Sequence, residues 1–329
     1  MKNVSILVPE TAVIEAIADP HYMFKAVNQF LESKGKGPLF KVQLVGLTKE
    51  VKLENSLYSV HTEKLIPEVK KTDLIFIPAI SGDMKTALRL NKDFVPWIID
   101  QYENGAEVAS LCIGSFLLAS TGLLNGKKCS SHWNSSTEFR SMFPEVELVD
   151  GSIITEEQRI YSSGGANSYW SLLLYLVEKY TDRDTAILAS KFFAVDIDRD
   201  SQAQFMLFMG QKEHGDKEIL KAQEFIEAHY QDKITVDELA DKFNIGRRTF
   251  ERRFKKATNN SVVEYMQRVK IEAAKRSFES SLKNINEVMF DVGYTDTKAF
   301  RTIFKKITGL TPVEYRNKYN KQPELSIGD

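Results

Sequence analysis

Cysteine is scarce in this sequence, with only Cys112 and Cys129 among 329 residues. Two thiols are too few for a disulfide framework, and neither stands in a zinc-type spacing, so we expect no metal site. No run reaches the roughly 18 apolar residues that a membrane helix needs. Acidic residues also follow the first apolar run too early for a secretory signal. We therefore expect a cytoplasmic protein with no metal, no cofactor and no membrane partner.

A large net charge is also lacking, because 44 basic and 45 acidic side chains leave a formal charge of −1. The balance is uneven along the chain. Residues 217–321 hold 22 Lys and Arg against 15 Asp and Glu, and the remainder holds 22 against 30. An acidic part joined to a basic part indicates that only the basic part meets a polyanion. The hydrophobic content of 43% excludes a mainly disordered chain, and the length favours two domains.

Strand and helix patterns alternate through the first half of the chain. Short apolar runs that read as strands are followed by longer stretches with helical periodicity. This order predicts an α/β domain, a flavodoxin-like parallel sheet sandwiched between helices. The expected strands are 4–8, 40–45, 74–77, 108–111, 146–149 and 153–160, and the expected helices are 14–31, 113–124 and 169–180.

The second half contains no strand pattern and begins after a polar stretch. We predict an α/β domain over 1–209, a linker over 210–216, an all-α domain over 217–320 and a polar tail over 321–329. The all-α part repeats itself, since Phe250, Phe254 and Lys255 recur fifty residues later as Phe300, Phe304 and Lys305. Two copies of one supersecondary unit explain this better than chance.

Each copy reads as helix, tight turn, helix. Residues 236–243 and 285–292 form the first helices, and short turns containing Gly246 or Gly293 lead into the second helices. An apolar stripe anchors each second helix, and donors for phosphates and base edges occupy its other face. The candidate DNA-binding residues are Arg247, Arg248, Thr249, Arg252, Arg253 and Lys256 in the first copy, and Thr297, Lys298, Arg301, Thr302 and Lys305 in the second.

The stretch 217–320 resembles the AraC family of transcription regulators. The resemblance rests on the pattern from Ile285 to Asp296, the Phe300 and Phe304 pair, and the segment from Gly309 to Arg316. Thr311 and Pro312 fit it as the N-cap and first residue of a last helix. The resemblance implies that both helix-turn-helix units insert into the major groove on one side of double-stranded DNA.

A candidate ligand pocket lies where a strand runs directly into a helix at Cys112. A sharp elbow beside a helix N-terminus exposes a residue and favours a thiolate or a bound anion. His132 lies twenty residues later and could bring an imidazole near the thiol. From the residues alone, a buried, inert cysteine remains an alternative.

The segment 108–133 resembles the PfpI-like domain of the glutamine amidotransferase-like superfamily. Together with the AraC-type part and the motif over residues 201–205, it resembles the GlxA-type regulators. Enzymes of the superfamily use a cysteine, a histidine and an acid, with a glycine-rich oxyanion turn. Here residues 78–82 lack the usual Gly pair and the acid has no clear counterpart, Glu15 being one residue off register. We therefore expect a binding pocket and no catalytic residue.

The pocket residues that we expect are Cys112, Ile113, His132, Glu15, Gly164 and Gly165. They would meet at the carboxyl ends of the parallel strands and bind an unknown small molecule, anionic or amide-bearing. We thus predict a ligand-responsive transcription regulator, with a homodimer implied by the PfpI-like resemblance. The alternatives are a cysteine-dependent amidase or glyoxalase-like enzyme, and a redox sensor acting through Cys112.

Overall fold

Two compact units make up the chain, Met1–Gln202 and Ala203–Asp329. The structure is a computed structural model that describes residues 1–197, 202–212 and 214–320. The expected polar tail, 321–329, lies outside the described residues, as does Ser201 of the motif over 201–205. Each unit has its own hydrophobic core, so the units are described separately.

The first unit is built around a seven-stranded sheet with the order β10-β11-β7-β6-β1-β2-β5. All neighbours pair in parallel except β10 and β11, which are antiparallel. The expected parallel α/β sheet is thereby confirmed. The strands are β1 (Lys2–Leu7), β2 (Phe40–Gly46), β5 (Lys64–Leu65), β6 (Leu74–Ile77), β7 (Glu107–Ser110), β10 (Ile154–Glu157) and β11 (Ile160–Ser163).

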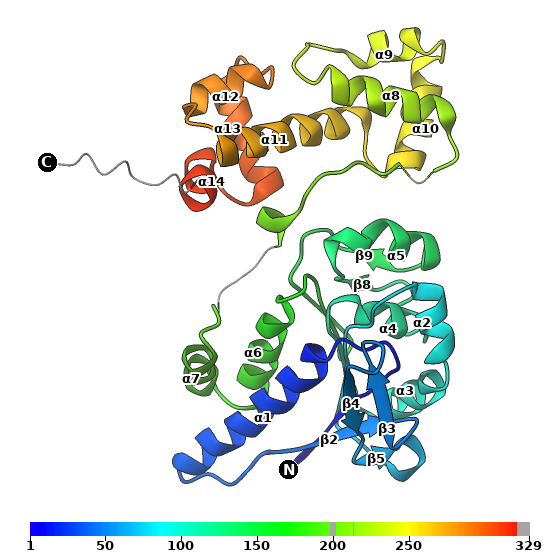
Figure 1. The fold of residues 1–329 in the computed structure, drawn as a ribbon, viewed down its shortest axis with the longest axis vertical. Helices are drawn as coiled ribbons and strands as arrows, with labels where there is room; N and C mark the ends of the chain where they lie inside the picture. The colour runs from blue at the N-terminus through cyan, green and yellow to red at the C-terminus, as the bar shows by residue number, and fades with distance from the viewer. Residues whose placement is uncertain (198–201, 213, 321–329) are drawn as a thin grey trace, which may run out of the picture. The chain divides into compact units, whose positions relative to one another are not determined.

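Helices cover both faces of this sheet, which explains why its central strand β6 is apolar throughout. Successive side chains of a strand point to opposite faces. Thus Phe76 joins one core, and Ile75 and Ile77 join the other. Figure 1 shows the two helical layers on either side of the sheet. One layer holds α1 (Glu15–Ser33), α6 (Tyr169–Tyr180) and α7 (Arg183–Phe193), and the other holds α2 (Met84–Leu90), α3 (Phe94–Glu103), α4 (Ser115–Ala119) and α5 (Ser136–Met142).

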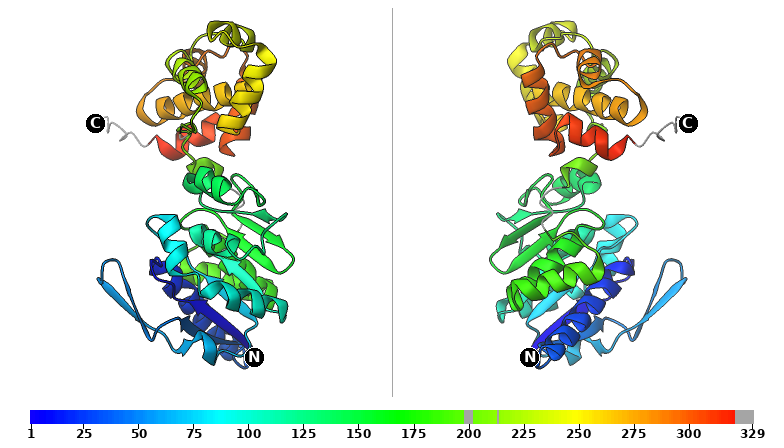
Figure 2. Two further views of the ribbon diagram at one scale, coloured as in Figure 1. Left: turned by 90° about the vertical axis from the view of Figure 1, so that its right-hand side faces the viewer. Right: turned by 90° about the vertical axis from the view of Figure 1, so that its left-hand side faces the viewer.

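Three small elements differ from the sequence expectation. A hairpin of β3 (Glu50–Leu53) and β4 (Tyr58–His61) extends away from the main sheet (Figure 2). The strand expected over 153–160 is wrong, because the chain turns at Gln158 and Arg159 and returns as β11. Both turn residues have positive φ, a conformation that Gly and Asn usually supply, so the sequence carried no turn signal. Two short strands, β8 (Lys128–Cys129) and β9 (Glu147–Leu148), form a separate parallel pair.

The second unit is helical, and its two helix-turn-helix units are confirmed. The first contains α9 (Val236–Lys242) and α10 (Arg247–Thr258), and the second contains α12 (Ile285–Asp291) and α13 (Thr297–Thr308). The long helix α11 (Val262–Ser280) connects them, as Figure 1 shows. The unit also contains α8 (Lys217–Ala228) and α14 (Pro312–Tyr319), and Thr311 and Pro312 take the expected N-cap and first helical positions.

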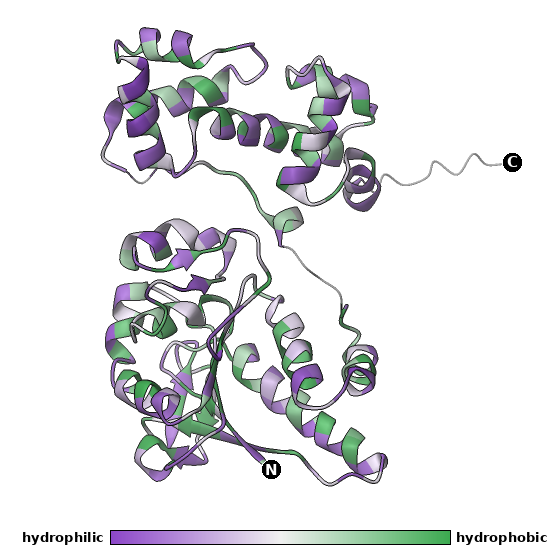
Figure 3. Ribbon diagram, turned by 180° about the vertical axis from the view of Figure 1, so that it is seen from behind, coloured by the Kyte–Doolittle hydropathy of each residue, from purple (hydrophilic) through white to green (hydrophobic). Residues whose placement is uncertain are grey.

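Each helix-turn-helix unit has a core of its own. The first half of α11 supplies Tyr265 and Val269 to the core of the first helix-turn-helix unit. The second half of α11 supplies Ala274 and Phe278 to the core of the second helix-turn-helix unit. Figure 3 shows the resulting alternation of hydrophobic and hydrophilic sides along these helices. The helical unit therefore consists of two small domains that share one helix.

Residues 203–212 and 214–216 pack within the helical unit. The 3-10 turn Ala203–Phe205 contacts α13, and Phe208 packs edge-to-face on Tyr265 at 5.0 Å. The compact helical unit thus begins at Ala203, upstream of the linker that the sequence places at 210–216. No described helix is long and apolar enough to span a membrane.

Candidate functional site

The two second helices, α10 and α13, have the same pattern of exposure at every one of their twelve positions. Phe250, Phe254 and Thr258 are buried in α10, and Phe300, Phe304 and Thr308 are buried in α13. The three buried positions are spaced by four, so they form one stripe on each helix. The opposite side of each helix is left to solvent.

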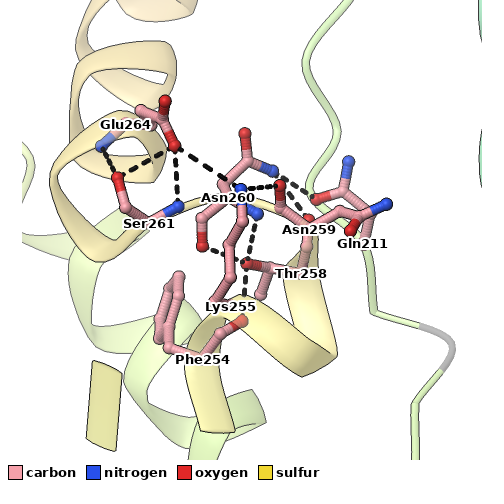
Figure 4. A network of polar contacts seen from close by, with 8 residues as sticks. All are labelled: Gln211, Phe254, Lys255, Thr258, Asn259, Asn260, Ser261 and Glu264. Atoms are coloured by element: carbon pink, nitrogen blue, oxygen red, sulfur yellow. Dashed lines mark hydrogen bonds and ion pairs between the residues drawn. The ribbon is translucent and has the colours of Figure 1, made fainter. Parts of the chain in front are cut away.

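A polar network fixes the end of α10 against the start of α11 (Figure 4). The buried Thr258 hydroxyl donates to Phe254 O at 2.8 Å and accepts from the Asn260 N–H at 3.2 Å. Ser261 and Glu264 then form a capping box at the first turn of α11. Asn260 also donates to the Gln211 side chain at 3.1 Å, which ties the segment before α8 to this corner.

The second copy repeats most of this network. The Thr308 hydroxyl donates to Phe304 O at 2.8 Å and accepts from the Leu310 N–H at 3.2 Å. Thr311 and Glu314 form the capping box at the start of α14. The repeated threonine and capping box therefore fix the C-terminal ends of both second helices in the same way.

Positive charge dominates these outer faces. Arg248 and Arg252 lie one turn apart on α10, and both are exposed. Among the described residues, neither guanidinium has a hydrogen bond or ion pair. The other expected DNA-binding residues that the structure leaves exposed are Arg247, Thr249 and Lys256 on α10, and Thr297, Lys298, Arg301, Thr302 and Lys305 on α13.

Two of the expected DNA-binding arginines have acidic partners within the helical unit. Arg247 pairs with Asp237 of α9 at 2.8 Å. Arg253 forms two hydrogen bonds to Asp216, at 2.9 and 2.5 Å, and this pair holds the pKa of the Asp216 carboxyl below its usual value. Arg253 stands where α13 has the half-buried Ile303. Arg253 therefore braces α10 against the start of α8, whereas Arg247 stays exposed in a surface ion pair that contributes little to stability.

The α/β unit contains a pocket of about 550 Å³ next to Cys112. Segments from five parts of the chain meet there, in accord with a site at the carboxyl ends of the strands. Of the expected pocket residues, the structure brings together Cys112, Ile113, His132 and Glu15. The lining residues that the sequence analysis missed are Val13, Ala16, Asp19, Ala79, Asn134, Ser135, Ala166, Asn167 and Tyr169.

Cys112 occupies a strained elbow. Its φ is +53°, and the turn presses so closely on the end of β6 that a Cβ on Gly114 would lie 2.6 Å from Ile77 O. The side chain is nevertheless buried, with 5% of its surface exposed. Burial raises the pKa of the Cys112 thiol to about 11, so the sulfur is a neutral thiol at pH 7. The helix after the elbow, Ser115–Ala119, is only five residues long.

His132 lines the same pocket without a hydrogen bond to the thiol among the described residues. Its Nδ1 accepts the backbone N–H of Asn134 at 3.1 Å, which leaves the proton of a neutral ring on Nε2. Burial lowers the pKa of the His132 imidazole. The ring is therefore neutral at pH 7 and supplies no charge to hold a thiolate.

One wall of the pocket is acidic. Glu15 and Asp19 lie one turn apart on α1 and both reach the pocket, and none of the described residues that line it is Lys or Arg. Tyr169 donates a hydrogen bond to Asp19 at 2.5 Å, and burial raises the pKa of the Asp19 carboxyl. The helical spacing from Glu15 was a signal for Asp19 that the sequence analysis did not use.

Gly164 and Gly165 are not lining residues, although the next two residues, Ala166 and Asn167, are. A Cβ at Gly164 would lie 2.6 Å from Ser131 O, and Gly165 has a φ of +78°. These glycines therefore permit close packing behind the pocket wall. Among the described residues, no group of three or more His, Cys, Asp or Glu side chains is arranged to hold a metal ion.

The alkylation rate of Cys112 gives a test of its environment. We expect iodoacetamide to modify it at a rate that rises about tenfold per pH unit between pH 7 and 10, because only the thiolate reacts. Peptide mass spectrometry of the full chain separates Cys112 from Cys129, whose pKa burial raises to about 12 and which serves as the internal comparison. A rate that levels off near pH 7 would contradict the neutral thiol and favour an activated cysteine.

Comparison with known proteins gives two family matches. Residues 239–318 match a helix-turn-helix domain family, and residues 21–179 match the DJ-1/PfpI family. The HTH-type transcriptional regulator GbdR of Pseudomonas aeruginosa is 25% identical over 241 residues, covering 72% of this chain and 65% of GbdR. The chain thus spans about 65% of the length of that relative.

Two further proteins cover one or both parts of the chain. The bifunctional transcriptional activator/DNA repair enzyme AdaA of Bacillus subtilis is 36% identical over 93 residues, which are 28% of this chain and 44% of AdaA. The crystal structure of a ThiJ/PfpI family protein from Pseudomonas syringae has a TM-score of 0.51 and 17% identity. It covers 74% of this chain and 90% of that chain, and the likeness concerns the fold.

Proposed function

The chain joins a DJ-1/PfpI domain to an AraC-type helix-turn-helix domain, and on this premise we propose that it is a DNA-binding transcription regulator. One observation carries the proposal: two helix-turn-helix units of identical exposure pattern each present a basic helix face to solvent. Such faces suit phosphates and the base edges of the major groove. The α/β domain senses a small molecule, as the pocket beside Cys112 indicates.

The pocket supports binding and not catalysis. An acyl-transfer enzyme needs a nucleophile activated by a nearby base. Here the thiol is neutral, no described residue links it to His132, and the turn over 78–82 lacks the usual Gly pair. The relatives are named as transcription regulators. The enzyme and the redox sensor acting through Cys112 therefore stay the alternatives that the alkylation test addresses.

The ligand that fits the pocket best is small and positively charged. The expectation of an anion rested on a helix N-terminus, but that helix has only five residues. Glu15 and Asp19 face the same space, and a cation placed there gains from both carboxylates. The Tyr169 ring on the same wall can also contact a cation. Asn134 and Asn167 offer amide groups that orient the rest of the ligand.

The regulator acts by linkage between the two domains. A ligand changes DNA binding only if it favours one arrangement of domains or subunits over another. A homodimer that reads paired sites in the cytoplasm of a bacterium fits this mechanism and follows the PfpI-like resemblance. The symmetry of such a dimer would set the relative orientation of the two DNA half-sites and the spacing between them.

The proposal is tested with the full-length chain and duplexes selected by it from a random pool. We expect specific binding whose affinity falls linearly in log–log salt plots, because phosphate contacts release counterions. Three probes of similar shape then report on the pocket: choline, neutral 3,3-dimethylbutan-1-ol and anionic 3,3-dimethylbutanoate. We expect choline to bind most tightly by calorimetry and to shift the DNA affinity.

The variant that tests the role of charge is Glu15→Gln, which removes one negative charge from the pocket and keeps the shape of the side chain. The substitution should reduce the preference for choline over the neutral probe. The affinity for the neutral probe should be the same in the wild type and in Glu15→Gln. Tightest binding of the anionic probe would contradict the charge of the ligand. No selective DNA binding at any salt concentration would overturn the regulator itself.

A further inference from the structure

The motif over residues 201–205 contains a glutamine whose side chain is almost completely buried. Gln202 exposes 2% of its surface, although glutamine is usually a surface residue. It is the last residue of the α/β unit, and Ala203 is the first residue of the helical unit. The peptide bond between them joins the two units. A polar side chain that is buried at this position is expected to have hydrogen-bond partners.

Gln202 is held by three hydrogen bonds to carbonyl groups of the α/β unit. Its amide nitrogen Nε2 donates to Ser131 O at 3.1 Å and to Ser152 O at 2.9 Å. Its backbone N–H donates to Gly151 O at 2.9 Å. We name the place where this side chain sits the Gln202 seat, formed by Ser131, Gly151, Ser152, Gly164 and Gly165.

Glycine is required on one side of the Gln202 seat. A Cβ on Gly164 would collide with the Gln202 side chain, and it would also lie 2.6 Å from Ser131 O. A Cβ on Gly165 would lie 3.3 Å from Gln202 Oε1. The two glycines that the sequence suggested for the ligand pocket thus make room for the glutamine.

The seat is incompletely satisfied. Among the residues that the structure describes, none donates a hydrogen bond to Gln202 Oε1, and this atom is buried. An unmet buried acceptor is unfavourable, so the two amide donors stabilise the seated state and the oxygen opposes it. Such a balance allows a small local change to release the side chain.

The seat shares its walls with the ligand pocket. Ser131 directly precedes the pocket residue His132, and Gly165 directly precedes the pocket residue Ala166. A ligand that moves either of these two segments changes the distances from their carbonyl groups and glycines to the amide of Gln202. On the other side, Ala203 begins a turn that contacts α13, the second DNA-facing helix.

We infer that Gln202 couples the ligand pocket to the DNA-binding unit, as a positioning residue whose seat responds to the state of the pocket. The inference rests on the proposed function, because it assigns the route by which sensing reaches the DNA-binding helices. In the seated state the chain is held to the pocket wall immediately before Ala203. When the wall moves, this anchor is released and the DNA-binding unit gains freedom. DNA and pocket are thereby linked in both directions.

Reciprocal linkage provides a test without the natural ligand. The probe is iodoacetamide, and the readout is the alkylation rate of Cys112 in the full chain at pH 8.5, with and without a selected duplex. We expect DNA to change the wild-type rate on the order of fivefold, the lower end of usual couplings. In Gln202→Met, which fills the seat without donors, the rate should be the same with and without DNA. In Gln202→Ala the alkylation rate of Cys112 should likewise be the same with and without DNA.

The matched control is Gln29→Ala, which removes an exposed glutamine from α1 and should keep the full response to DNA. A merely structural role for Gln202 would change the basal alkylation rate but leave the response to DNA intact, and that result overturns the inference while the regulator survives. A wild-type rate that ignores bound DNA overturns both the coupling and the sensing proposal. A chain that binds no DNA overturns the regulator at its base.

Discussion

Replacing both Arg248 and Arg252 by alanine is expected to reduce the affinity of the full chain for a selected duplex more than any other change on its surface. Each arginine is exposed on the outer face of α10 and has no partner among the described residues, so it is available for DNA. An arginine that reads a guanine contributes about 1–3 kcal/mol, which corresponds to about fivefold to 150-fold in affinity.

The salt dependence distinguishes the two ways in which these arginines can contact DNA. If an arginine contacts a phosphate, its loss should weaken binding to all duplexes and lower the log–log salt slope by about 1. If it reads a base, the loss should be confined to the selected sequence. Lys221→Ala is the control for each single arginine variant, since it removes one positive charge from the exposed surface of α8. Unchanged affinity in the double variant would mean that α10 does not face DNA.

The equivalent position of the second unit should matter less. Thr302 stands fifty residues after Arg252 and carries a single hydroxyl, whose hydrogen bond contributes about 0.5–1.5 kcal/mol. We therefore expect the selected sequence to be defined more sharply on the α10 side. Arg253 differs from both, because its loss breaks the pair with Asp216 and so loosens α8 from α10.

Phe304→Ala is expected to destabilise the second helix-turn-helix unit by about 3–5 kcal/mol, because a fully buried ring leaves a cavity. The ring contacts Phe278, Phe300 and Tyr315, with centroids 5.5 to 5.7 Å away. Small domains have only about 5–15 kcal/mol of total stability, so this loss opens the unit. Specific DNA binding should fall with it.

Hydrogen exchange of the full chain shows where the loss is felt. The two helix-turn-helix units have separate cores. In Phe304→Ala, the backbone amides of α12, α13 and α14 should therefore lose protection from exchange, while those of α9 and α10 keep it. Phe254→Ala should give the reverse pattern. The control is Phe290→Ala, since that ring is 59% exposed and its loss should change little. Equal loss of protection in both units would mean that they fold as one.

The sequence alone was sufficient for the helical half. Its elements are amphipathic helices, and the period of their apolar positions is visible in the sequence. The fifty-residue repeat then specified which helices correspond, and α10 and α13 follow the predicted turns that contain Gly246 and Gly293. The parallel sheet was predictable for the same reason, because strands buried on both faces are short apolar runs.

The elbow at Cys112 was also visible in the sequence, since a strand that runs directly into a helix leaves little choice of turn. The presence of Glu15 and His132 in the same pocket agrees with that expectation. The charge of the pocket was not predictable from these residues. It depends on Asp19 and on the lack of Lys and Arg among the described lining residues, which come from distant segments.

Tertiary structure alone decided which polar side chains are free and which are engaged. Arg253 looks like its neighbours in the sequence, but its partner Asp216 lies 37 residues away. Gln202 reads as a polar residue of a junction, but its donors meet carbonyl groups of residues 131 and 152. Local sequence fixes the periodicity of helices and strands, because neighbouring residues share one backbone. Hydrogen bonds and ion pairs between distant segments depend on how those segments pack, and packing is a property of the whole fold.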